Sequence, residues 1–166
     1  YLGQLLAESV KLFHCSKNTI LKRHKFVNES QVNGFLKQDK DVIIVLGHYG
    51  NWEWALLASS LNFDAEMVGI YKPLSSTFWN KQVLKIRSQF GATLLSMKES
   101  VRHLLKKGKK ARIIGILSDQ TPSTDELNHW INFLNQKTPV FLGTEKLAKK
   151  IDCPIFFAHI KPLSRA

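Results

Sequence analysis

The spacing of apolar residues along the chain separates segments with a helical pattern from segments with an extended pattern. Residues 2–13 carry apolar side chains at the three- and four-residue spacing of a helix, at Leu2, Leu5, Leu6, Val10 and Phe13. Residues 22–27 alternate between polar and apolar and predict a short strand. Residues 28–36 predict a helix that begins at Asn28, Glu29 or Ser30. The first part of the chain is therefore expected to form a helix, a strand and a second helix.

Two runs of aliphatic residues predict strands that are buried on both faces, at residues 42–46 and 112–117. Shorter extended segments are predicted at residues 66–71, 93–95 and 154–160. The segments between them have helical composition, at residues 51–61, from Ser75 or Ser76 to about Phe90, 100–107 and 144–150. This alternation predicts an α/β layered domain with a largely parallel or mixed central sheet flanked by helices.

Residues 118–142 interrupt the alternation. A turn is predicted at Pro122, Ser123, Thr124 and Asp125, and large apolar side chains follow at Trp130, Phe133, Pro139 and Phe141. The segment is interpreted as an irregular loop, and loops of this size often carry function.

Length and composition favour one folded domain over residues 1–166. The chain has 166 residues, of which 44% are hydrophobic and 22% charged, as in ordinary globular proteins. Its longest apolar runs are far shorter than the ~20 residues that a membrane-spanning helix requires. Because the sequence opens at Tyr1 without an initiator Met and ends just beyond a predicted strand, we expect an internal piece of a longer protein.

The chain is strongly basic, with 24 Lys and Arg against 13 Asp and Glu and a formal net charge of +11. This charge favours anionic partners such as nucleic acid, anionic lipid or an acidic carrier protein. The densest basic cluster lies around Gly108 and is either a solvated helix end or a contact surface; it comprises Lys106, Lys107, Lys109, Lys110 and Arg112. Cys15 and Cys153 lie far apart without a ligand pattern, so reduced, buried thiols are expected.

A histidine between two glycines follows the first buried strand, where ligands bind in α/β sheets. Gly47 and Gly50 allow tight backbone geometry around His48, and Asn51 can cap a helix that carries Glu53. If all of these residues were on one helix, the two side chains would point about 140° apart, since each residue turns a helix by ~100°. The pair can therefore act together only if His48 lies in the loop.

In that arrangement, the Glu53 carboxylate can accept a hydrogen bond from one ring nitrogen of His48, and the other nitrogen can take a proton from a substrate hydroxyl. A His and a Glu at this spacing also occur without a shared role. The preceding buried strand, the glycines and the apolar surface of Trp52 and Trp54 favour the functional interpretation. The remaining histidines have no partners at ligand spacing, and no metal site is predicted; they are His14, His24, His103, His129 and His159.

Further candidate site residues follow the other predicted strands. Asp119 and Gln120 come after the second buried strand and should share the sheet edge with His48, although Asp119 could instead cap the following turn. Gly143 and Thr144 open the last predicted helix, where their amides could bind an anion or serve only in capping.

The sequence resembles the bacterial lipid A biosynthesis acyltransferase family, the late lauroyl and myristoyl transferases, whose members share an H-x4-D/E motif. The matching motif here is His48-Tyr49-Gly50-Asn51-Trp52-Glu53. Further ordered matches are Gly69-Ile70-Tyr71-Lys72-Pro73, Arg87 to Gly91, Ser118-Asp119-Gln120-Thr121-Pro122 and Phe141 to Ala148. The resemblance extends over nearly the whole chain.

This resemblance implies transfer of a fatty acyl group from an acyl carrier protein thioester to a hydroxyl of a lipid A precursor. It implies His48 as general base, Glu53 as its orienting partner, and no metal or other cofactor. It places the reaction at the cytoplasmic face of the bacterial inner membrane, with anionic lipid and the membrane surface as partners. The family pattern also includes an N-terminal membrane helix and further C-terminal sequence, both absent from these 166 residues.

Lys72 lies in a Tyr-Lys-Pro segment where relatives carry Arg, and it could contact a phosphate as a point charge or remain a solvated loop residue. Backbone amides around Gly50 and Asn51 are candidates for stabilising an oxyanion. Two alternatives stay open: a glycerophospholipid or glycolipid acyltransferase, or a thioesterase, that uses the same His–Glu pair, and a nucleic-acid-binding module based on the Lys106 to Arg112 cluster. We expect no nucleic acid partner, because no recognised binding motif supports that module.

Overall fold

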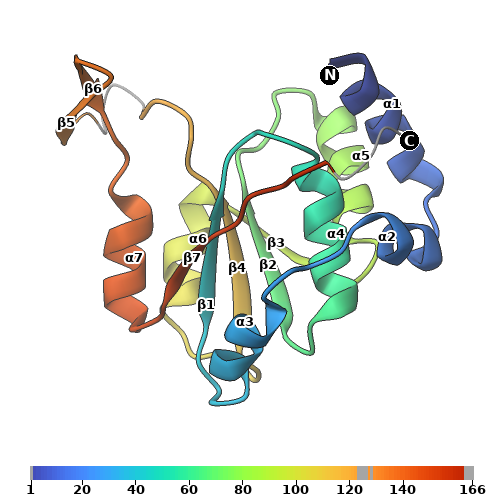
Figure 1. The fold of residues 1–166 in the computed structure, drawn as a ribbon, viewed down its shortest axis with the longest axis horizontal. Coiled ribbons are helices and arrows are strands. Elements are labelled where there is room, and N and C mark those ends of the chain that lie inside the picture. Colours follow the sequence, from blue (N-terminus) through green and yellow to red (C-terminus); the bar gives the residue numbers. More distant parts are fainter. Residues whose placement is uncertain (1, 123–126, 128, 163–166) are drawn as a thin grey trace.

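The protein folds around a parallel sheet of five strands, ordered β3-β2-β4-β1-β7 (Figure 1). The computed structural model describes residues 2–122, 127 and 129–162. The strands of the sheet are β1 (Val42–Leu46), β2 (Glu66–Tyr71), β3 (Thr93–Ser96), β4 (Arg112–Leu117) and β7 (Ile155–Phe157). All of their pairings are parallel. The predicted α/β class with a central parallel sheet is confirmed.

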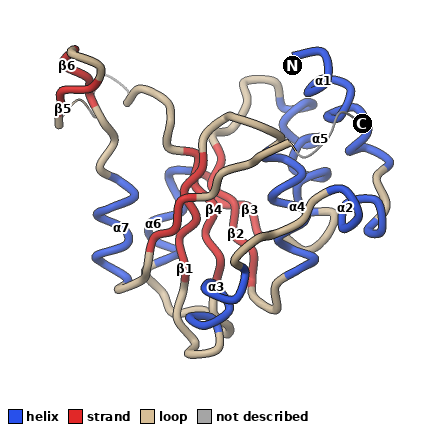
Figure 2. The backbone as a smooth tube through the Cα atoms, viewed as in Figure 1, coloured by secondary structure: helices blue, strands red, loops and turns tan. Residues whose placement is uncertain are grey.

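Helices cover both faces of the sheet (Figure 2). The helices of the described residues are α1 (Leu2–Lys11), the short 3-10 helix η1 (Leu12–His14), α2 (Lys17–Arg23), α3 (Glu29–Leu36), α4 (Trp52–Asn62), α5 (Thr77–Ser88), α6 (Met97–Leu104) and α7 (Gly143–Ile151). Helices α6 and α7 pack on one face, and α3 and α4 pack on the other. An outer layer from η1, α2 and α5 packs against α4.

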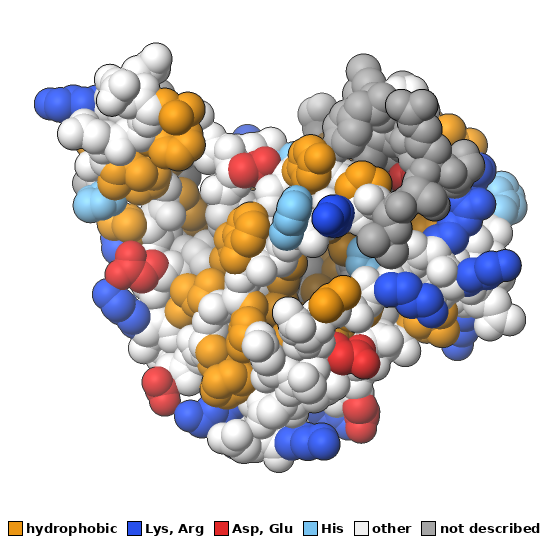
Figure 3. Space-filling model, viewed as in Figure 1, with side chains coloured by type: hydrophobic (Ala, Val, Ile, Leu, Met, Phe, Trp, Pro, Cys, Tyr) orange, Lys and Arg blue, Asp and Glu red, His pale blue; other side chains and the backbone are white. Residues whose placement is uncertain are grey.

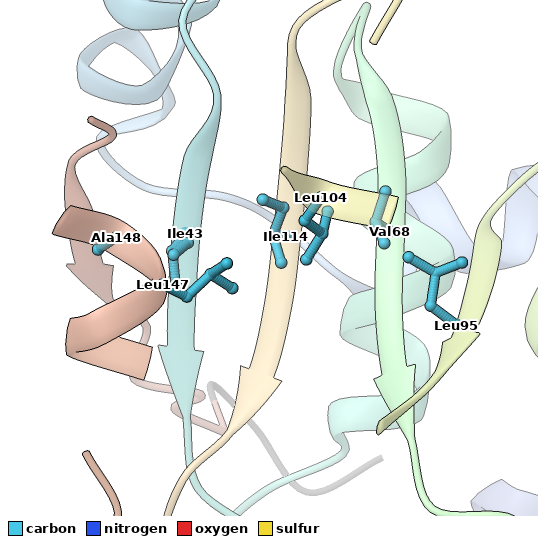
Figure 4. Packing of buried hydrophobic residues seen from close by; sticks show 7 residues of the cluster. All are labelled: Ile43, Val68, Leu95, Leu104, Ile114, Leu147 and Ala148. Carbon is cyan, nitrogen blue, oxygen red and sulfur yellow. The ribbon is translucent and has the colours of Figure 1, made fainter. Parts of the chain in front are cut away.

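Alternating side chains of the strands supply the two faces of the core. Ile43 and Ile114 point toward α6 and α7, where they pack with Leu104 and Leu147 (Figure 4). Ile113, the neighbour of Ile114 along β4, packs toward α3 and α4 instead. Since successive residues of a strand point to opposite faces, a continuous aliphatic run is what a sheet covered on both sides requires.

The strand predicted at residues 22–27 is wrong. Residues 17–23 form α2, and residues 24–27 have no strand partner. Ser16 caps this helix, because its hydroxyl accepts a hydrogen bond from the Thr19 amide at 3.2 Å. Ile20 is fully buried against α4, so tertiary packing of this one side chain outweighs the local alternation of the sequence.

Arg112 is a buried structural residue and not part of a solvated basic cluster. Its side chain is 3% exposed, and its Nε donates to Asp41 Oδ2 at 3.0 Å. Its Nη2 also donates to the carbonyl of Leu104 at 2.9 Å, at the end of α6. These contacts lie where α6 ends. The helix spans Met97–Leu104, three residues earlier in the chain than the predicted segment 100–107.

The lysines of that cluster lie at the end of the sheet where β4 begins, opposite to the end where the strands finish (Figure 1). Lys107 Nζ lies 2.6 Å from Asp39 Oδ2, and Lys110 Nζ lies 3.1 Å from Asp64 Oδ1. Both carboxylates belong to loops that precede strands. The cluster is therefore remote from residues that follow the strands, such as His48.

The segment 118–142, predicted to be irregular, contains a two-stranded antiparallel hairpin. Its strands are β5 (Trp130–Phe133) and β6 (Gln136–Pro139), joined by Leu134 and Asn135. The two turn residues have φ values of 49° and 61°, a conformation that usually selects Gly, Asn or Asp. The hairpin was missed because a Leu-Asn turn lacks that signal. Residues 123–125 of the turn predicted at Pro122 to Asp125 lie outside the described residues.

One smaller difference concerns the end of an element. The last strand ends at Phe157 and not at Ile160, and residues 158–162 have no regular secondary structure. No helix of the described residues combines the length and apolar character needed to cross a bilayer.

Candidate active site

His48 lies in the loop between β1 and α4, outside the helix, as predicted. The helix begins at Trp52, and Asn51 caps it by accepting a hydrogen bond from the Trp54 amide on Oδ1 at 3.1 Å. Glu53 accordingly lies in the first turn. The loop follows β1, which is hydrogen-bonded to β4 on one side and β7 on the other, and this pairing fixes where the loop begins.

The carboxylate that binds the His48 ring is Asp119. The ring Nδ1 lies 2.6 Å from Asp119 Oδ1, and the His48 backbone amide donates to Asp119 Oδ2 at 2.7 Å. Parallel pairing explains this contact, because Leu46 of β1 is in register with Leu117 of β4, and each residue of interest lies two positions further on. A Cβ on Gly47 would lie 3.2 Å from Asp119 Oδ2, so glycine allows the two loops to approach closely.

This contact keeps the Asp119 carboxylate ionised and sets which nitrogen of a neutral His48 ring carries the proton. Partial burial would raise the pKa of Asp119, but hydrogen bonds from the His48 amide and ring outweigh it and hold that pKa below its ordinary value. The ionised carboxylate accepts a proton-bearing Nδ1, which leaves Nε2 as the acceptor nitrogen of the neutral ring. The described residues give Nε2 no hydrogen-bond partner. The ring of Trp52 packs edge-on against His48, with centroids 4.8 Å apart.

Glu53 binds Arg87 of α5, and the expected hydrogen bond from the His48 ring to the Glu53 carboxylate is absent from the described contacts. Arg87 Nε donates to Glu53 Oε2 at 2.8 Å and Arg87 Nη2 to Glu53 Oε1 at 2.5 Å, so both carboxylate oxygens are used. The side chains are only 20% and 23% exposed. The paired geometry is the bidentate one that guanidinium and carboxylate groups favour. The Glu53–Arg87 pair thus joins α4 to α5.

The other predicted site residues line one broad, open cavity that extends from the ends of the strands along the face of the sheet covered by α3 and α4. Asn51, Lys72, Gln120, Gly143 and Thr144 all line it, as do His48, Glu53 and Arg87. The lining also includes apolar residues such as Trp52, Ile116 and Phe141, which suit a hydrocarbon chain.

Local contacts limit what some of these residues can offer. The Thr144 hydroxyl lies 3.2 Å from the Ser118 hydroxyl, which ties α7 to the loop after β4. A Cβ on Gly143 would lie 2.2 Å from the Phe141 ring, so a larger residue where α7 begins requires that exposed ring to move. Lys72 is exposed and has no ion-pair partner among the described residues.

Sequence reasoning missed Glu8 of α1 as a support of the site. Asn51 Nδ2 donates to Glu8 Oε2 at 2.7 Å, and Trp54 Nε1 donates to the Glu8 carbonyl at 3.3 Å. These contacts hold the N-terminal helix against the start of α4. No local pattern identifies Glu8, because its partners lie more than 40 positions further along the chain.

Gly50 fixes the other side of the loop, and we expect Gly50→Ala to disturb the site. Its φ is +72°, and a Cβ there would lie 2.5 Å from Cγ2 of Ile160. The left-handed backbone alone costs a residue with a Cβ about 1–2 kcal/mol, and the clash adds to this cost. Thermal unfolding should show a lower midpoint than wild type. Gly34→Ala is the control, since no atom lies within 4 Å of its Cβ position; equal midpoints for the two variants would contradict the assignment.

Neither cysteine is a nucleophile at neutral pH. Both are free thiols and half-buried. Burial raises the pKa of Cys153 to about 11 and raises that of Cys15, so both stay protonated. The described residues contain no group of three or more His, Cys, Asp or Glu that could hold a metal ion.

The sequence model of the family described as bacterial lipid A biosynthesis acyltransferase matches residues 1–161. The chain belongs to this family. No curated protein sequence matches it. The match covers every helix and strand of the fold, including the β5–β6 hairpin. The arrangement around His48 is therefore the candidate active site of a transferase that moves acyl groups.

Proposed function

We propose that this acyltransferase moves a fatty acyl group from an acyl carrier protein thioester to a hydroxyl of a lipid A precursor, with His48 as general base. The observation that carries the proposal is the His48–Asp119 contact, which leaves Nε2 as a proton acceptor beside a cavity with apolar lining. A base held in this way needs no protein nucleophile, and the described cysteines are unsuited to that role.

The reaction then follows from the ring geometry. Nε2 of His48 takes the proton of the acceptor hydroxyl as its oxygen attacks the thioester carbonyl. The Asp119 carboxylate stabilises the imidazolium that forms. The carbon–sulfur bond breaks as the tetrahedral intermediate collapses, and the imidazolium returns its proton to the departing thiolate. The products are the ester and the carrier thiol, and His48 is again neutral.

Glu53 remains a proposed active-site residue, acting through Arg87. Its carboxylate holds the guanidinium at the cavity wall by two hydrogen bonds. Arg87 Nη1 has no protein partner among the described residues, so it can donate to a phosphate or to the thioester oxygen. Glu53 is thus a positioning residue in the structure described, and it also anchors the turn that carries Trp52.

The acceptor and donor are proposed from the charges that surround the cavity. Lys72 and Arg87 offer cationic groups for the phosphate of a lipid A precursor. Gln120 and the backbone amides of Asn51, Gly143 and Thr144 offer polar contacts along the same wall. The net charge of +11 favours an acidic carrier protein and an anionic membrane, which supports a location at the cytoplasmic face of the inner membrane.

A nucleic-acid-binding function has no comparable support. Its proposed contact cluster loses Arg112 to the interior, and Lys107 and Lys110 each lie against a carboxylate.

The test is a product assay with defined donors and acceptors. The protein is incubated with acyl carrier protein or coenzyme A thioesters and with a lipid A precursor, a glycerophospholipid or a glycolipid, and the products are identified by mass spectrometry. We expect an acylated lipid A precursor from the carrier-bound donor. Free fatty acid as the main product would indicate a thioesterase, and acylation of only the other lipids would assign a different acceptor; either result would overturn the proposal.

A further inference from the structure

The β5–β6 hairpin exposes large apolar side chains along β5 and at its turn. Trp130 is 51% exposed, Phe133 57% and Leu134 79%. The hairpin projects from the body of the protein at the end where the strands of the sheet finish (Figure 1), and in the space-filling view it forms a lobe beside a notch in the surface (Figure 3). Such side chains are normally buried in a core or against a partner.

Apolar residues occupy both faces of this hairpin. Successive residues of a strand alternate between faces, so Trp130 lies on one face of β5, and Ile131 and Phe133 lie on the other. All four residues of β5 are exposed. A lipid interface can contact both faces of such a hairpin at once.

The turn contains an apolar residue, Leu134, at a position where the backbone conformation favours a small or polar residue. Leu134 has a φ of 49°, a left-handed conformation that Gly, Asn and Asp adopt most easily. An exposed Leu at this position stabilises neither the turn nor a described core. Its presence is accounted for if the side chain contacts something outside the chain.

A second apolar group lies at the same end of the sheet, around the start of α5. Leu74, Phe78 and Trp79 are 49%, 60% and 57% exposed, and the two aromatic rings pack edge to face with centroids 5.3 Å apart. This group follows β2, the hairpin follows β4, and the loop that carries His48 follows β1. Because these strands are parallel, all three segments lie at the same end of the sheet. Two separate apolar groups therefore belong to the end of the molecule that carries His48.

Exposed lysines at this end can contact an anionic surface. Lys72 and Lys161 lie in the loops after β2 and β7, Lys137 lies in β6 of the hairpin, and all three are exposed. In the described part of these loops the carboxylate is Asp119, which is bound to His48. Glu99 and Glu145 lie in the first turns of α6 and α7 at the same end; Glu145 is paired with Lys149, and Glu99 accepts a hydrogen bond from the Ser96 hydroxyl. Aromatic residues with nearby lysines are typical of the membrane–water interface, where the rings contact acyl chains and the amines contact phosphates.

We propose that the β5–β6 hairpin and the start of α5 dock this protein on an anionic phospholipid surface with the cavity mouth facing the lipid. The proposal rests on the proposed function, because it specifies how a lipid acceptor reaches the site. Insertion is shallow, since the outer backbone groups of a two-stranded hairpin must keep their water or headgroup partners. The tip side chains Phe133 and Leu134 enter the interface, and the lysines contact lipid phosphates.

The test measures binding of the 166-residue chain to vesicles of phosphatidylethanolamine and phosphatidylglycerol by flotation. The tip variant is Phe133→Ser with Leu134→Asn, and Asn suits the left-handed turn, so the hairpin should fold. We expect its partition coefficient to fall about tenfold or more, because the variant loses the two apolar side chains that enter the lipid interface. Leu105→Asn is the matched control. Leu105 is 42% exposed and follows the last residue of α6, at the end of the sheet where the strands begin, so this variant should bind like wild type.

Two lysine variants compare the contribution of this surface with that of the basic cluster around Gly108. Replacement of Lys72, Lys137 and Lys161 by Gln should weaken binding to anionic vesicles, whereas replacement of Lys106, Lys107, Lys109 and Lys110 by Gln removes more charge and should weaken it less. The proposal is overturned if wild type does not bind vesicles, if the tip variant loses less than about fivefold, or if the cluster variant has the larger effect. Self-association that depends on the tip, without vesicle binding, would assign the hairpin to a second copy and also overturn it.

Activity distinguishes this inference from the proposed function. The tip variant should acylate an acceptor dispersed in detergent at the wild-type rate and an acceptor embedded in vesicles more slowly. If wild type acylates neither, the proposed function fails while the vesicle-binding result still decides the docking surface. If the tip variant is equally active in both, the docking surface fails and the proposed function stands.

Discussion

Replacing His48 by Ala is expected to lower acyl transfer on the order of 10²–10⁴-fold while the protein stays folded. The imidazole supplies the only proton acceptor that we assign to the reaction, and general base catalysis contributes on the order of 10²–10⁴-fold. The side chain is 32% exposed and lies in a loop, so its loss removes little core packing. Transfer is measured by single-turnover assays with the carrier-bound donor, and folding by circular dichroism and thermal unfolding.

The matched control for this variant is His103→Ala. His103 is exposed near the end of α6, remote from the sheet edge that carries His48. It should transfer acyl groups at the wild-type rate. If His48→Ala retained activity within about tenfold of wild type, a general base at His48 would be excluded.

Asp119→Asn is expected to lower turnover on the order of 10²-fold or more. An ionised carboxylate keeps the proton on Nδ1 and Nε2 unprotonated, whereas an amide can donate to Nδ1 and so favour the ring with its proton on Nε2. That form cannot accept the hydroxyl proton. Since the pKa of Asp119 is held below its ordinary value, the carboxylate stays ionised in wild type from neutral pH down to acid conditions. Its stabilising contact is present above the ordinary carboxyl pKa and is lost as pH falls through the lowered one.

Glu53→Gln should also lower turnover, for a different reason. It removes the charge that faces Arg87, so both the position of the guanidinium and the packing of α4 on α5 are weakened. A lower unfolding midpoint should accompany the lower rate. Arg87→Gln should reproduce both changes, because it breaks the same pair.

Double variants decide which carboxylate acts through the ring. If Asp119 works through His48, the variant with both His48→Ala and Asp119→Asn should be no slower than His48→Ala alone. Glu53→Gln should slow the His48→Ala enzyme further, measured as residual transfer. The opposite pattern, with Glu53 non-additive and Asp119 additive, would return Glu53 to the role of orienting partner of His48.

The sequence by itself determined the α/β class, the strand that precedes the site and the position of His48 outside the helix. Each of these depends on local signals: aliphatic runs such as residues 42–46 that suit a strand buried on both faces, and Asn51 as a helix cap. The family was also readable from ordered motifs in the chain, and the match over residues 1–161 confirms it.

Tertiary structure decided which groups touch one another. The strand order places β1 beside β4, so Asp119 meets His48 across 71 positions of sequence, and the packing of α5 on α4 gives Glu53 to Arg87. The positions of Asp119 and Glu53 followed from local patterns, but their partners did not, because a hydrogen bond depends on distances of a few tenths of an ångström that only packing sets. For the same reason the hairpin tip at Leu134 could not be foreseen, since its turn exists through pairing of β5 with β6 and not through a turn sequence.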